Sequence, residues 1–154
     1  MTHFLGTHQN KLDAKGRVSV PAPFRTALKG NDETNGTHFV LRRSHQHPCI
    51  EAWPTPAFDA LTESLNQLHV FSQEHDDLAA TLCADAFPVE ADKEGRIVLP
   101  DDLVAYAGLT DTVMFMGLGR IFQIWEPAAA ERRRDEARNR ARERGLTLAG
   151  VSTS

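Results

Sequence analysis

The sequence predicts a mainly β protein with appended helices (α+β), in which two internal repeats combine into one β-barrel or interleaved sheet with pseudo-two-fold symmetry. Two observations support this prediction: a nine-residue block recurs 79 positions later, and the same order of elements follows each copy. The chain of 154 residues has about the length of one domain, or of two very small ones. One repeat of about 45 residues is too small to bury a core alone, so we expect both to fold together.

The recurring block begins with aspartate and ends with proline. It spans 13–21 and 92–100, with Asp, Gly, Arg and Pro identical and the apolar positions of the same kind. An aspartate accepts hydrogen bonds from nearby backbone N–H groups and a glycine allows a positive φ, so the block predicts a tight turn that leads into a strand. The residues expected to structure the two turns are Asp13, Gly16, Asp92, Gly95 and Arg96.

The segments after each block predict a short helix and two strands per repeat. The helices are expected at 23–30 and 101–108, and each ends at a glycine. The strands are expected at 37–42, 49–53, 112–116 and 121–125. The tryptophans that end the two repeats are 72 positions apart rather than 79, so the first repeat has about seven extra residues between its strands.

Three helices are predicted outside the repeats. Apolar residues at steps of three and four predict an amphipathic helix at about 56–70, and a second helix is expected at about 74–84. A proline near its start and Gly145 at its end bound a third helix at 128–144, which is polar nearly all round. The apolar residues of the first helix, which leave a face that needs a partner, are Phe58, Leu61, Leu65 and Leu68.

These elements predict the domain organisation. Residues 1–130 are expected to form a single compact double-repeat domain, and 131–154 an Arg-rich helix with a flexible tail. Within the domain, we expect repeat 1 at about 7–54, a helical linker at about 55–84 and repeat 2 at about 86–127.

Charge is distributed unevenly along the chain. The net charge is -4, yet residues 1–54 have a net charge of +3, residues 55–131 of -11 and residues 132–154 of +4. A polyanion senses charge within about 10 Å, so a positive surface can exist on an acidic protein. The chain has no apolar run of membrane-spanning length, its start lacks the pattern of a signal sequence, and its two cysteines are too few for a disulfide scaffold. We therefore expect a cytoplasmic protein with two buried, unreactive thiols.

Lys15 distinguishes the two predicted turns. Its counterpart in the second turn is Glu94, so we expect only the first turn to present two cations at its tip. A purely structural interpretation of Asp13 and Arg17 is an ion pair across the turn, since Asp92 and Arg96 repeat it in acidic surroundings. That role and a functional use of Arg17 are compatible.

The motifs together resemble the MraZ family of bacterial transcriptional regulators. The likeness rests on the two blocks and on Phe4–Gly6, His47–Pro54, Tyr106–Leu109 and Phe122–Trp125, and it runs from about residue 3 to about residue 130. It implies an AbrB/MazE/SpoVT-like fold, in which swapped hairpins interlock into a barrel. It also implies closed rings of subunits that bind repeated promoter sites upstream of the division and cell-wall genes and repress their own operon. No role is implied for the Arg-rich helix.

The resemblance places the DNA contact in the segment from Asp13 to Arg17. Lys15 and Arg17 are the first candidates, since an arginine bonds bidentately to a guanine edge. Lys11 and Arg25 suit contacts with phosphates. The expected partners are double-stranded DNA and further copies of the chain, and the expected location is the cytoplasm, associated with the nucleoid.

Other functions have weaker support in the sequence. A zinc site at His38, His45, His47 and Cys49 lacks a second ligand pair at finger spacing, so we expect no metal and no cofactor. The chain has none of the serine-hydrolase, phosphate-loop or HExxH motifs, so we expect no enzyme, and Gly117–Gly119 is interpreted as a hairpin turn. An AbrB-fold protein-interaction module, antitoxin-like or a scaffold, without specific DNA binding remains the alternative.

Overall fold

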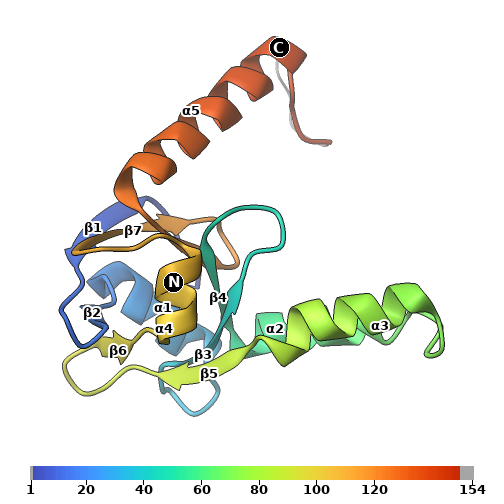
Figure 1. Cartoon of the computed structure of the whole chain (residues 1–154), viewed down its shortest axis with the longest axis horizontal. Helices are drawn as coiled ribbons and strands as arrows, with labels where there is room; N and C mark the ends of the chain where they lie inside the picture. Colours follow the sequence, from blue (N-terminus) through green and yellow to red (C-terminus); the bar gives the residue numbers. More distant parts are fainter. Residues whose placement is uncertain (1, 150–154) are drawn as a thin grey trace.

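A computed structural model describes residues 2–149 and shows a mixed α+β fold, mostly sheet with helices around it (Figure 1). The first half contains β1 (Thr7–Lys11), β2 (Arg17–Ser19), α1 (Ala22–Asn31), β3 (His38–Arg43) and β4 (Ile50–Pro54). The middle contains α2 (Thr55–Leu65), α3 (Gln73–Ala79) and the π-helical turn η1 (Ala80–Ala84). The second half contains β5 (Phe87–Glu90), β6 (Arg96–Val98), α4 (Asp101–Tyr106), β7 (Thr112–Gly117), β8 (Phe122–Trp125) and α5 (Pro127–Arg144). The predicted α+β class and the repeated order of elements are confirmed.

The strands of the two repeats are interleaved in the larger sheet. The larger sheet has six antiparallel strands in the order β1-β7-β8-β4-β3-β5, so the first strand of each repeat pairs with the hairpin of the other repeat. The sheet is not closed, because β2 and β6 pair with each other and leave β1 and β5 as its edges. The predicted barrel is therefore an open, interleaved sheet in the described chain, with the β2–β6 ribbon as a separate element.

The β2–β6 ribbon is the centre of the pseudo-symmetry. Val18 faces Ile97 across it, and these side chains are 1% and 3% exposed. At its two ends, Leu99 donates a backbone hydrogen bond to Gly16 (2.8 Å) and Val20 donates one to Gly95 (2.8 Å). The same exchange at both ends places the two predicted turns at opposite ends of one ribbon.

A single aromatic core joins the repeats. Phe122 of β8 lies 5.0 Å from Phe24 of α1, 5.0 Å from Phe4 and 5.8 Å from Phe39 of β3, measured between ring centroids. All four rings are buried, and each buried phenylalanine contributes about 1.5–3 kcal/mol to folding. Neither repeat contains this cluster by itself, which is the physical reason for their joint folding.

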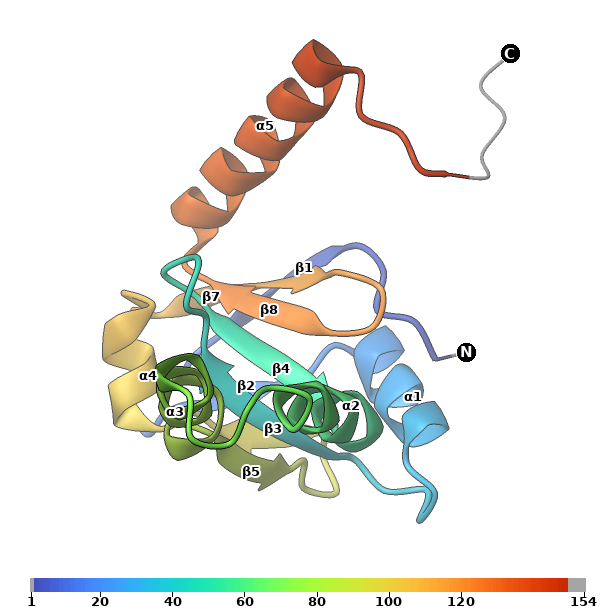
Figure 2. The ribbon, with the colours of Figure 1, turned by 90° about the vertical axis from the view of Figure 1, so that its right-hand side faces the viewer.

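The helices between the repeats form an arm, α2 to η1. Figures 1 and 2 show α2 and α3 projecting together from the sheet. The predicted helix at 56–70 ends earlier, at Leu65, and beyond it the N–H groups of Gln67 and Leu68 bond to carbonyls only three residues back, as in tight turns. The second predicted helix is divided into α3 and the π-helical η1. No helix within residues 2–149 has the length and apolar character needed to cross a membrane.

A buried ion pair attaches the arm to the sheet. Arg42 of β3 and Glu51 of β4 lie opposite each other, with Nη1 and Oε1 2.5 Å apart and the side chains almost fully buried. Arg42 Nη2 also donates to the carbonyl of Thr81 in η1 (3.3 Å), and Trp53 donates to Glu51 (3.0 Å).

The second repeat has a neutral version of this arrangement. Met116 lies opposite Gln123, and Trp125 Nε1 donates to Gln123 Oε1 at 2.8 Å. The chain therefore contains its own comparison for the buried pair, with the same strand geometry and no charge.

We predict that Glu51→Gln destabilises the protein by about 3 kcal/mol, because it leaves the buried Arg42 charge without a counter-ion. The double variant Arg42→Met, Glu51→Gln reproduces the Met116–Gln123 pair and should recover most of that loss. Urea unfolding of the two variants and the unchanged protein measures both effects. Equal stability of the single and double variants would contradict the prediction.

Candidate nucleic-acid interface

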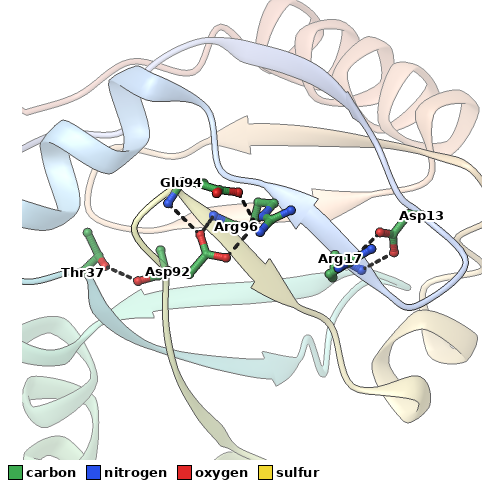
Figure 3. A network of polar contacts seen from close by, with 7 residues as sticks. Asp13, Arg17, Thr37, Asp92, Glu94 and Arg96 are labelled. Atoms are coloured by element: carbon green, nitrogen blue, oxygen red, sulfur yellow. Dashed lines mark hydrogen bonds and ion pairs between the residues drawn. The ribbon is translucent and has the colours of Figure 1, made fainter.

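The two turns at the ends of the ribbon have the same construction (Figure 3). In the first, the Asp13 carboxylate accepts backbone hydrogen bonds from Lys15 (2.9 Å) and Arg17 (2.8 Å), and Gly16 has a φ of 81°. In the second, Asp92 accepts from Glu94 (2.9 Å) and Arg96 (2.9 Å), and Gly95 also has a φ of 81°. A side chain other than glycine is strained at this φ, so the repeated Asp and Gly fix the backbone of both turns.

Both arginines pair with the aspartate of their turn. The Nε of Arg17 lies 2.7 Å from Asp13, and that of Arg96 lies 3.2 Å from Asp92. Backbone hydrogen bonds from the arginines are the main reason why the pKa of each carboxyl is lowered. The pairs are about 40% exposed, so they orient the guanidinium groups more than they stabilise the protein.

The free ends of the two guanidinium groups differ. Arg17 pairs with no carboxylate of residues 2–149 except that of Asp13, whereas Arg96 pairs with Asp92 and also lies, through Nη2, 2.7 Å from Glu94 (Figure 3). Lys15 replaces this glutamate in the first turn, is exposed, and forms no ion pair in the described chain. The fork of Arg17 is therefore available to an external acceptor, and that of Arg96 is partly occupied.

The expectation that only the first turn presents two cations was wrong. Lys93 stands where the first turn has Ala14, so both turns present two cations. What distinguishes them is Glu94, which neutralises Arg96. The first turn has a net charge of +1 over 13–17, and the second has none over 92–96.

The outward face of the ribbon contains residues of both repeats. Since side chains alternate along a strand, Arg17 and Ser19 of β2 lie on the same face as Arg96 and Val98 of β6. Val98 is 59% exposed although it is apolar. The ribbon therefore presents two guanidinium groups, a hydroxyl and a methyl surface to solvent.

A surface hollow of about 450 Å³ lies beside this face. Lys11, Arg17 and Arg96 line it, together with Asp13 and Asp111. The structure thus brings predicted DNA-contact residues of the first repeat next to Arg96, which the sequence assigned only to a turn. The antiparallel pairing of the two blocks places Arg96 there, and the signal for that pairing was the repeat itself.

Arg25 has a different environment. Its Nη1 donates to the carbonyl of Val20 (2.6 Å), and a Cβ on Gly95 would come within 2.5 Å of its Cδ. The side chain is half-buried and packs over the second turn, which Thr37 also holds through a hydrogen bond to Ala91 (3.4 Å, Figure 3). A phosphate contact by Arg25 remains a prediction.

The histidines and cysteines are dispersed. His38 lies between Asp32 (2.8 Å) and Glu90 (3.0 Å), and these contacts raise its pKa. Within residues 2–149 no group of three or more His, Cys, Asp and Glu side chains is placed to hold a metal ion. Burial raises the pKa of Cys49 to about 12, but Cys83 is exposed, so the expectation of two buried thiols was wrong for Cys83.

Comparisons with known proteins agree on one family. The sequence model described as MraZ protein matches residues 3–80 and 82–146. The chain is 65% identical over 150 residues to the transcriptional regulator MraZ of Gluconacetobacter diazotrophicus, covering 97% of this chain and 95% of that protein. It is 58% identical over 142 residues to that of Gluconobacter oxydans (92% and 87%) and 39% identical over 133 residues to that of Rhodospirillum rubrum (85% and 84%). The family match includes α5, beyond the limit near residue 130 that the motifs gave.

We predict that the two turn carboxylates make the protein less stable in acid. Their pKa lies below the ordinary 3.8, so their charged form stabilises the fold at higher pH, and this contribution is lost as the pH falls below that value. Asp13→Asn with Asp92→Asn keeps an acceptor in each turn but removes the titration. Urea midpoints between pH 5 and pH 2.5 should fall less steeply for the double variant, with each single variant intermediate. Identical slopes would contradict the prediction.

Proposed function

The chain belongs to the MraZ family, and we propose that it is a sequence-specific DNA-binding transcriptional regulator. In this proposal it represses its own operon by binding repeated promoter sites in double-stranded DNA as a closed ring of copies. The names of its relatives support regulation of transcription, and the ribbon supports the mode of contact with DNA.

One observation carries the proposal: Arg17 lies on the outward face of a two-stranded ribbon and Lys15 lies in the turn at its end. Within residues 2–149 Arg17 pairs only with Asp13, and Lys15 forms no ion pair. Neighbouring strands are about 4.8 Å apart, and the major groove is about 12 Å wide and admits such a ribbon. The guanidinium group is planar, and the hydrogen bond from Arg17 Nε to Asp13 fixes its orientation, which favours a bidentate contact through the Nη groups.

The residues on and beside the ribbon then have distinct roles. Arg17 contacts the O6 and N7 atoms of a guanine, while Lys15 and Lys11 contact phosphates. The exposed methyl groups of Val98 suit a thymine methyl group. Arg25 is also expected to contact a phosphate, and its side chain packs on the second turn, which carries Arg96.

The ring increases affinity by repeating one weak site. A single copy offers few cations, so one copy on one site should bind weakly and lose affinity steeply with salt. Several ribbons in one assembly engage spaced sites at once, and their effective concentration depends on how easily the DNA bends between them. This explains the expected preference for repeated promoter sites.

We also infer that residues 1–130 form one double-repeat domain with an AbrB-like exchange of hairpins. The cross-repeat pairs β1–β7, β5–β3 and β2–β6 support the exchange, although the larger sheet stays open. The Arg-rich helix then follows the domain as a separate element. The predicted flexible tail extends to residue 154, and its part at 150–154 lies outside the described residues.

We predict that Lys15→Glu weakens binding to the promoter array by about tenfold or more, because the new carboxylate would occupy the fork of Arg17 as Glu94 occupies that of Arg96. The matched variant Glu94→Lys frees the second fork and should leave binding unchanged or tighter. Fluorescence anisotropy with labelled DNA from upstream of the gene measures both. If Lys15→Glu binds like the unchanged protein, the first turn is not the DNA contact.

A second prediction concerns the type of contact. Lys15→Ala should reduce the slope of log K against log salt by about one and weaken all DNA sequences alike. Arg17→Lys should keep the slope but reduce the preference for the promoter by about 1–3 kcal/mol. Binding titrations at four salt concentrations, with promoter and scrambled DNA, separate the two effects. If neither DNA binds at any salt concentration, the alternative of a protein-interaction module is supported instead.

A further inference from the structure

The arm is acidic and ends in exposed apolar side chains. Residues 55–85 contain six Asp and Glu and no Lys or Arg. At the turn between α2 and α3, Phe71 is 89% exposed and Val70 is 62% exposed. The turn is ordered by hydrogen bonds, since Ser72 donates to the His69 carbonyl (2.7 Å) and accepts from the N–H of His75 (3.0 Å). A phenylalanine is thus held in water at the end of a projecting element.

A hollow of matching character lies between α5 and the sheet. It has a volume of about 380 Å³, and its apolar lining includes Met116, Leu118 and Ala137. Leu118, on the turn between β7 and β8, is 49% exposed. Three arginines also line the hollow: Arg133, Arg134 and Arg138.

The charges of the two surfaces are complementary. Helix α5 contains seven arginines and four acids, a net charge of +3, against -6 over residues 55–85. Arg134 pairs with Glu131 and Arg138 with Asp135 on the helix itself, but these exposed pairs are weak and can be exchanged. Arg133 forms no ion pair with another described residue.

The arm points away from the hollow of its own chain. In Figure 1 the arm leaves the sheet sideways while α5 rises from another edge, and the view in Figure 2 agrees. A contact between the two surfaces therefore requires two molecules. Because the surfaces differ, the contact is head-to-tail, and each copy in a series uses both of its surfaces.

We propose that the tip of the arm, Val70 and Phe71, inserts into the α5 hollow of a second copy, with the acidic arm against its arginines. This inference rests on the proposed ring and names the contact that would form it. The occupant is a second copy because both halves of the contact are present on the same chain with opposite charge. The acidic arm is repelled by an anionic membrane surface and by DNA.

The test uses two variants that each remove one half of the contact. Phe71→Asp removes the tip and keeps the hollow, and Leu118→Asp removes the hollow and keeps the tip. Light scattering should find each variant alone as a monomer. An equimolar mixture should give a one-to-one pair that does not grow, because it offers one intact tip and one intact hollow. Val98→Asp, at a residue that is 59% exposed on the β2–β6 ribbon, is the control for this sizing experiment and should keep the size of the unchanged protein.

Each outcome bears on the proposal. Monomeric variants that pair only when mixed support it. Variants that keep the mass of the unchanged protein overturn it, and so do monomeric variants that do not pair when mixed. If Phe71→Asp lowers the mass and Leu118→Asp does not, the contact is tip to tip and the proposal is overturned. If Leu118→Asp does not fold, Arg138→Glu replaces it, since that side chain is exposed on α5.

A DNA measurement distinguishes this proposal from the proposed function. The Phe71→Asp protein should bind one isolated promoter site as the unchanged protein does, and should lose its preference for the repeated array. If no variant, nor the unchanged protein, binds DNA while the sizes change as expected, the contact stands and the regulatory function fails.

Discussion

The antiparallel pairing of β2 with β6 is the interaction on which the rest of the structure depends. It buries Val18 against Ile97 and exchanges backbone hydrogen bonds with the glycines of both turns. Without it, the two Asp-x-x-Gly-Arg turns would be separate loops on separate half-domains, each too small to bury a core. With it, two guanidinium groups from opposite halves of the sequence lie on one face of one ribbon.

Duplication supplies the scaffold, and a few substitutions supply the asymmetry. The turns share their aspartate, glycine and arginine, so their backbone is the same, and the difference in chemistry comes from Lys15 against Glu94. The same holds in the larger sheet, where the Arg42–Glu51 ion pair of β3 and β4 corresponds to a neutral pair in the second repeat. In both places the two repeats share their backbone geometry and differ in the charge of a few side chains.

The sequence predicted the repeats, the turns and most elements, because each depends on local chemistry: an Asx turn, a glycine with positive φ, an apolar alternation. It did not predict which strands pair, since pairing between β1 and β7 depends on contacts about 105 residues apart. It missed Lys93 as a cation of the second turn and Arg96 as part of the outward face. Lys93 stands in the sequence and needed only a position-by-position comparison of the two turns, whereas the place of Arg96 depends on the pairing of β2 with β6, which was not predicted.

The net charge of -4 conceals a separation of charge that has a structural reason. The arm that carries these carboxylates projects away from the ribbon (Figure 1), and salt largely screens exposed charges that are more than about 10 Å apart. The ribbon can therefore meet a polyanion while the arm does not oppose it. If arms seat against α5 helices of neighbouring copies, the acidic charge is neutralised within the assembly, and each added copy leaves its basic ribbon as the surface that faces DNA.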